Sequence, residues 1–276
     1  MSDPVHFNDI LALLDNANKS LETEIFVPSL NASFTAKALN ANHTKNIVKT
    51  TVEGPFADNQ FTIIMHTILS DIFANRIDLK TINLWDKLLI LLQLRSKNIK
   101  DEAKLTFISE ENKQVEKSIS LAKHIDKLKK NLPTFANETI HIGVDENSKY
   151  DFVLNFPSVT EEFTFENQLY QNKLSKIAED DVKQMKELIA PIFLSRTAPF
   201  IKSIIINDNT IDLVSRSVSE RIAIVERLPS KAILTILNKI DEVYGKALQE
   251  ATKVTKTIDG VSYTAQIKID ASFFIG

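Results

Sequence analysis

The side chains able to do chemistry are scattered along this chain at spacings that form no familiar reaction centre. No two of its histidines lie four residues apart, the spacing that places both imidazoles on one helix face, and no His-Glu-x-x-His motif occurs. The chain has no cysteine, which excludes zinc-thiolate sites and thiol nucleophiles. We interpret the histidines as surface or boundary residues and predict no metal site. They are His6, His43, His66, His124 and His141.

Two pairs of adjacent carboxylates, Glu161-Glu162 and Asp180-Asp181, are the candidates for acid–base work. Asp180-Asp181 stands where a helix is expected to begin, and acidic side chains there cap free N–H groups and complement the helix dipole. The chain has only 5 glycines and none are clustered, which argues against a backbone phosphate cradle. We predict no catalytic residues and no cofactor. An enzyme with an unrecognised site stays an alternative.

Composition places the chain among ordinary globular proteins. It has 276 residues, 43% hydrophobic and 25% charged, with a net charge of −3 and a pI near 6.0. The acidic balance argues against a direct nucleic-acid partner, and we interpret the basic run of Lys129 and Lys130, near Lys123 and Lys127, as a solvated helix end. The longest apolar run, Leu88 to Leu92, is far short of the roughly 20 residues that span a bilayer.

Several segments show the apolar spacing of helices. In residues 61–73 the apolar side chains recur at i, i+3, i+4 and i+7, which predicts an amphipathic helix. Residues 84–97 are apolar almost all round, as in a helix buried within a fold or between subunits. Residues 166–196 and the run from Pro229 predict further helices. In the charge-rich stretch 101–137, a stripe at Val115, Ile119, Ala122, Ile125 and Leu128 also predicts a helix.

Other segments alternate as strands do. Residues 24–36 are expected to be extended, and residues 140–156 and 201–214 to form hairpins. Residues 254–269 alternate around Asp259-Gly260, a strong hairpin signal. The predicted fold class is therefore α+β, with helical bundle elements combined with antiparallel β-hairpins and no Rossmann or barrel signature. We expect an N-terminal extended arm plus helical region at 1–100 and a mixed helix and β-hairpin region at 101–276, with a single domain as the alternative.

The C-terminal residues are unusually apolar for a chain end. Phe273, Phe274 and Ile275 are nearly the last residues, and each large apolar side chain gains about 1.5–3 kcal/mol on burial. We expect them to finish an apolar C-terminal strand. That strand packs either inside the protein's own core or, as exposed apolar ends do, against a neighbouring subunit.

Six blocks of mostly packing residues follow one another in the sequence and cover about half of the chain. They run from Ile25 to Asn31, from Thr44 to Lys49, from Asp86 to Arg95, from Arg221 to Pro229, from Ile233 to Ile240 and from Ile267 to Phe274. The order of these blocks resembles the baseplate hub protein family of T4-like contractile-tailed phages, while residues 101–198 show no such likeness.

This resemblance implies a structural component of a phage tail baseplate, in its hub region, that acts through protein–protein interfaces during tail assembly. It implies other baseplate and tail proteins as partners, several copies in a symmetric assembly, and a place in the virion after assembly in the host cytoplasm. The interface candidates are Trp85, Phe273, Phe274 and Ile275. The alternative is a baseplate assembly factor that is absent from the mature virion.

Overall fold

The computed structural model describes residues 13–14, 17, 21–51, 56–74, 76–130, 133, 139–143, 149–172, 189–207 and 209–275. Side chains are described throughout these ranges except at 139–143, 149, 172 and 189–190. His6, Asp180 and Asp181 lie outside the described residues, and so does the 173–188 part of the helix predicted over 166–196.

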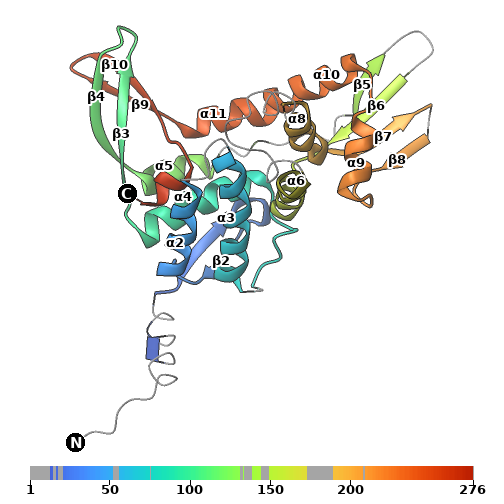
Figure 1. Ribbon diagram of the computed structural model, residues 1–276. Coiled ribbons are helices and arrows are strands. Elements are labelled where there is room, and N and C mark those ends of the chain that lie inside the picture. Colours follow the sequence, from blue (N-terminus) through green and yellow to red (C-terminus); the bar gives the residue numbers. More distant parts are fainter. Residues whose placement is uncertain are drawn as a thin grey trace, which may run out of the picture.

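A hairpin and three helices build most of the first of the three largest cores (Figure 1). The hairpin buries Ile25 and Val27 against helices that contribute Met65, Leu69 and Phe73. The extended opening and both helices predicted here are confirmed. The elements are β1 (Thr23–Val27), the short 3-10 helix η1 (Pro28–Leu30), β2 (Ala32–Ala36), α2 (Ala41–Thr50), α3 (Ala57–Phe73) and α4 (Leu84–Asn98).

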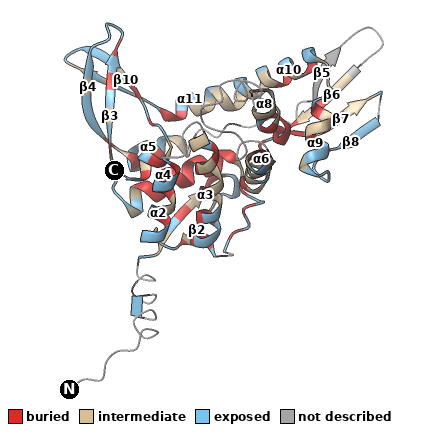
Figure 2. Cartoon of the chain, viewed as in Figure 1, coloured by how far each residue is buried: buried red, intermediate tan, exposed pale blue. Residues whose placement is uncertain are grey.

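Helix α4 lies between two cores, which explains why its sequence is apolar all round. Every residue from Leu84 to Arg95 is buried, and Figure 2 shows this helix among the most buried parts of the chain. Ile90 and Leu94 belong to the first core, whereas Leu89 and Leu92 belong to the second. The predicted burial is thus provided by the chain itself on both sides of the helix.

Two hairpins far apart in the sequence form a sheet of order β4-β3-β10-β9, here called the split sheet. Strands β3 and β10 pair only near the tip, where Tyr263 lies opposite Ser109 and Thr264 opposite Ile108. At its base the second core joins both hairpins to α4, α5 and α11. The bounds are β3 (Glu102–Ser109), β4 (Gln114–Ser120), α5 (Leu121–Leu128), α11 (Lys246–Thr252), β9 (Lys253–Ile258) and β10 (Val261–Gln266).

A second sheet, here called the continuous sheet, has its strands in sequence order β5-β6-β7-β8. The third core covers it with apolar side chains from neighbouring helices, including Phe165, Val225 and Ile236. Both hairpins predicted in this part of the chain are confirmed. The bounds are β5 (Thr139–Gly143), β6 (Lys149–Leu154), α6 (Val159–Asn172), α8 (Ile189–Thr197), η4 (Ala198–Phe200), β7 (Ile201–Ile206), β8 (Asn209–Asp212) and α9 (Val218–Val225).

One long helical run connects the two sheets across the molecule (Figure 1). It comprises α10 (Ser230–Ile240), the π-helical turn η5 (Asp241–Gly245) and α11. Tyr244 on the π turn packs its ring against Phe156 and Phe200, at centroid distances of 5.6 and 5.7 Å. The turn therefore fastens the long helix to the segments that flank the continuous sheet.

Two secondary-structure predictions are wrong. The helix expected to begin at Val115 is instead strand β4 followed by α5, because Val115 and Ile119 face inward on alternate strand positions while Ile125 lies on the helix. The apolar C-terminal strand is instead the short helix α12 (Ala271–Ile275). Asp270 starts it by accepting hydrogen bonds from Phe273 N–H and from the Ser272 hydroxyl.

The architecture confirms the α+β class, with antiparallel pairing in every described sheet. Ala271 and Phe274 pack in the first core, together with residues of the N-terminal helices. Among the described residues, no helix combines the length and apolar content needed to cross a membrane.

Candidate functional site

Helix α4 uses its few polar side chains to hold distant backbone segments. The buried carboxylate of Asp86 accepts hydrogen bonds from Ser29 N–H at 2.9 Å, from the Ser29 hydroxyl at 2.5 Å and from Asn83 N–H at 2.9 Å. Asn83 caps the same helix by accepting from Trp85 N–H and Asp86 N–H. A buried carboxylate is tolerated when donors fill its lone pairs, so Asp86 fixes η1 against the start of α4.

Two turns further along, Gln93 binds strand β1 as another strand would. Its amide oxygen accepts from Phe26 N–H at 3.0 Å, and its amide nitrogen donates to Phe26 C=O at 2.8 Å. Gln93 is itself buried. One side chain thus satisfies both backbone groups of a residue that has no other strand on that side.

Arg95 ties the C-terminal helix to α4. Its Nε donates to Phe273 C=O at 2.7 Å and one terminal nitrogen donates to Lys100 C=O at 2.6 Å. The guanidinium also lies 5.8 Å from the centroid of the Phe273 ring, within the range of a cation–π contact. Asp86, Gln93 and Arg95 therefore explain why polar residues interrupt an otherwise apolar helix. Sequence reasoning missed this role, although polar side chains inside a predicted buried helix were a signal that they need partners.

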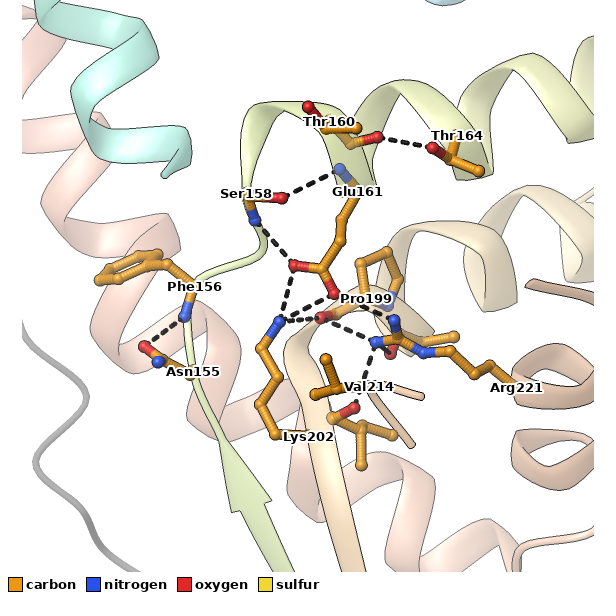
Figure 3. A network of polar contacts seen from close by, with 12 residues as sticks. Asn155, Phe156, Ser158, Thr160, Glu161, Thr164, Pro199, Lys202, Val214 and Arg221 are labelled. Carbon is orange, nitrogen blue, oxygen red and sulfur yellow. Dashed lines mark hydrogen bonds and ion pairs between the residues drawn. The ribbon is translucent and has the colours of Figure 1, made fainter. Parts of the chain in front are cut away.

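A second polar cluster braces the continuous sheet, and Figure 3 shows it. Glu161, in the first turn of α6, accepts from Lys202 Nζ at 3.0 and 2.8 Å, from Arg221 at 3.0 Å and from Ser158 N–H at 2.9 Å. The buried Arg221 also donates to the carbonyls of Ala198, Pro199 and Ile201 at 3.1 to 3.2 Å.

The electrostatics of this cluster suit a structural role, in which charged side chains hold segments of the chain together. Burial by itself raises the pKa of Glu161, but the hydrogen bonds and charges of Lys202 and Arg221, with the Ser158 N–H, outweigh it and leave the pKa below its usual value. The carboxylate is therefore ionised at neutral pH and fully occupied by donors. Its neighbour Glu162 pairs with Lys87 on α4. The two carboxylates of the predicted pair are thus engaged in separate ion pairs.

The described histidines also have separate environments. His43 Nε2 lies 2.9 Å from Asp71, His66 stacks on Phe163 at 4.0 Å, and His124 Nε2 lies 2.6 Å from the carbonyl of Ala251. Burial lowers the pKa of His66 and His124, which favours their neutral forms at neutral pH. Within the part of the chain that the structure describes, no three potential ligands gather at a metal position.

The four interface candidates lie in two places. Phe273, Phe274 and Ile275 are on α12, where Phe274 is 2% exposed and packs on Phe61, whereas Ile275 is 47% exposed. Trp85 is 4% exposed, in the second core. Of the four, Ile275 is thus the one whose side chain is about half exposed.

In these clusters, buried polar side chains hold distant segments of the chain together, as in a protein with a structural role. Comparison with known families shows which family the chain belongs to. The profile of the family described as T4 bacteriophage base plate protein matches residues 20–269, most of the chain. The chain belongs to this family, and it is a structural component of the phage baseplate, located in the tail of the virion with other tail proteins as its partners. Curated proteins and solved structures give no match.

Proposed function

We propose that the protein is a subunit of the hub region of the baseplate and that it works through protein–protein interfaces formed during tail assembly in the host cytoplasm. The observation that carries the proposal is the anchored C-terminal helix. Arg95 holds the backbone of α12 while Ile275 remains 47% exposed. An apolar side chain that is rigidly presented to solvent favours binding to another protein.

The surroundings of α12 support the same reading. Helix α12 packs on α2, where Val48 is 39% exposed, and Arg95 links α12 to the end of α4, where Ile99 is 41% exposed. In this proposal Phe273 and Phe274 position α12, and Ile275 makes the contact with the neighbouring subunit. Trp85 contributes through a cavity described below. Several copies around the symmetry axis of the baseplate follow from the proposed place in the hub.

The direct test is Ile275→Asp, because a buried contact does not tolerate a new unpaired carboxylate. Deleting the whole tail is less informative, since that would also remove Phe274 from the core. The matched control is Leu234→Asp on α10, where the wild-type side chain is 60% exposed. Thermal unfolding checks that both variants fold, and complementation of a phage lacking the protein measures assembly.

We expect Ile275→Asp to fold as the wild type does but to lower incorporation into baseplates at least tenfold, and Leu234→Asp to incorporate normally. Normal incorporation of Ile275→Asp would show that α12 does not form the contact with the neighbouring subunit. Quantitative mass spectrometry of purified virions distinguishes a hub subunit from the alternative, an assembly factor that is absent from the virion. Binding to tail proteins together with absence from finished particles would identify an assembly factor instead of a hub subunit.

A further inference from the structure

A cavity of about 730 Å³ lies where α5, α11 and the start of β9 meet, at the base of the split sheet. Its size falls within the range of protein sites that enclose a ligand or an anchoring peptide. Part of its wall is apolar, formed by Trp85, Leu128 and Val254. None of the polar clusters described above lies in this cavity, so its role is separate from theirs.

The charges around the cavity are mainly positive, although the whole chain carries a net charge of −3. Lys127, Lys130 and Lys253 line it with a single carboxylate, Glu250, which lies 3.7 Å from Lys253. Within the described residues no ion pair involves Lys127 or Lys130, whereas Lys129 between them pairs with Asp126. Two cations that pair with no carboxylate of the described residues, beside an apolar wall, favour a ligand that carries both carboxylates and apolar side chains.

Trp85 adds a buried donor to this wall. Its indole Nε1–H is shielded from solvent and has no hydrogen-bond acceptor within the described part of the chain. Buried donors are nearly always paired in folded proteins, and an unpaired one is destabilising.

The remaining wall is the open edge of a sheet. Strand β9 is the last strand of the order β4-β3-β10-β9. Ile267 N–H donates to Thr252 C=O at 2.8 Å. In an antiparallel pair, every second residue from Thr252 therefore directs its backbone N–H and C=O toward β10. Thr255 is one of the residues between these, so its backbone groups point to the open side of β9. Val254 and Thr255 both line the cavity. An extended peptide could therefore add to β9 while its alternate side chains enter the cavity.

We propose that this cavity binds an extended segment of another baseplate protein, in which every second residue enters the cavity and these residues include both apolar side chains and Asp or Glu. The apolar side chains pack on Trp85 and Leu128, the carboxylates pair with Lys127 and Lys130, and the segment's backbone bonds to the edge of β9. That the segment comes from a baseplate protein rests on the proposed function, but the binding itself does not.

Trp85 is the single tryptophan of the chain, so the tryptophan fluorescence comes from a side chain in the wall of this cavity. The experiment titrates the purified full chain with a pool of acetylated, amidated hexapeptides. These carry Leu, Val, Phe, Asp or Glu at the first, third and fifth positions, with at least one acid, and Ser or Thr between them. A matched pool carries Asn or Gln in place of the acids. The test variant is Lys127→Gln with Lys130→Gln. The control variant is Lys45→Gln with Lys49→Gln, which removes the same charge from exposed positions on α2.

We expect a saturable change of Trp85 fluorescence with the acidic pool, at least a tenfold weaker affinity in the test variant, and wild-type affinity in the control variant. No saturation, an equal response to the neutral pool, or equal weakening in both variants would overturn the proposal. A similar response to inorganic phosphate alone would also overturn it, in favour of a simple anion site. Because peptide binding is measured on the isolated protein, its failure is distinct from a failure to enter baseplates.

Discussion

The two four-stranded sheets are built from the same parts, two hairpins joined through their inner strands, but they are joined in different ways. In the continuous sheet, β6 and β7 pair from Tyr150 opposite Ile206 to Leu154 opposite Ile201. In the split sheet, β3 and β10 pair at only two positions near the tip. The rest of that join depends on the second core, in which Phe107 and Ala265 face the helices of the body.

The difference shows two ways to fix a β-structure on a helical body. The continuous sheet is braced by a buried charge cluster that bonds α6, η4, β7 and α9 at once. The split sheet is braced by apolar packing, with the amine of Lys256 on one outer strand donating to Ser118 C=O on the other at 2.8 Å. We therefore expect the continuous sheet to be sensitive to loss of charge and the split sheet to loss of volume.

The largest expected effect is on the packing of the split sheet. Phe107→Ala removes a ring that is fully buried, and we expect a loss of about 4 kcal/mol in the free energy of unfolding. Urea unfolding followed by circular dichroism measures the loss, and hydrogen exchange locates it. Strands β3, β4, β9 and β10 should lose protection while β6 and β7 keep theirs.

The matched variant is Phe152→Ala, at a fully buried ring of the continuous sheet. Equal loss of protection in both sheets for either variant would mean that the sheets unfold as one unit.

The next effect is on the charge cluster. Arg221→Met leaves Glu161 short of a cation and three carbonyls short of a donor, so we expect a loss of about 3 kcal/mol. The control is Arg216→Met, whose guanidinium is half exposed and lies 3.8 Å from Glu220, and which should cost less than about 1 kcal/mol. Urea unfolding of both variants measures the two losses in the free energy of unfolding. A loss below that of the control would show that packing, and not charge, braces the continuous sheet as well.

The same contrast separates what local sequence predicts from what it cannot. The Asp259-Gly260 turn, the continuous-sheet hairpins and the all-round burial of α4 follow from patterns within a few residues, and the structure confirms them. The pairing of Tyr263 with Ser109 has no local signature, because it depends on two hairpins meeting from distant parts of the chain. Strand β4 was missed for a related reason. Val115 and Ile119 are four residues apart, a spacing that places two side chains on one face of a helix or on one face of a strand.

The candidate site divides in the same way. Trp85 could be placed in a buried helix from its apolar neighbours, and the baseplate family could be suspected from the block order. The cavity could not be predicted, because its walls come from α4, α5, α11 and β9. Nor could the joint role of Glu161, Lys202 and Arg221, which no short motif connects.

The charge cluster also makes a prediction about pH. The pKa of Glu161 is lower in the folded protein than its ordinary value, so its contribution to stability is present above the ordinary pKa and is lost as the pH falls through the folded one. Urea unfolding between about pH 6 and pH 3 should therefore show a shallower loss of stability for Glu161→Gln than for the wild type. The control Glu116→Gln changes an exposed carboxylate of the split sheet and should keep the wild-type slope. Parallel slopes for wild type and Glu161→Gln would place the acid sensitivity elsewhere.

The smallest effect is at the turn that presents β10 to β3. Asp259 and Gly260 both have positive φ, 49° and 78°, as the two-residue hairpin turn requires. A Cβ added at Gly260 would meet nothing within 4 Å, so Gly260→Ala adds backbone strain without a clash, and we expect a loss of about 1 kcal/mol. In the continuous sheet, Asn207 has φ 48° at the corresponding turn, and Asn207→Gly should change stability by no more than about 0.5 kcal/mol. Hydrogen exchange at Ile108 and Thr264, the pair whose backbone groups point at each other across the join, then tests whether a weaker hairpin opens it. If protection there is unchanged despite the loss in stability, the second core alone holds the two hairpins together.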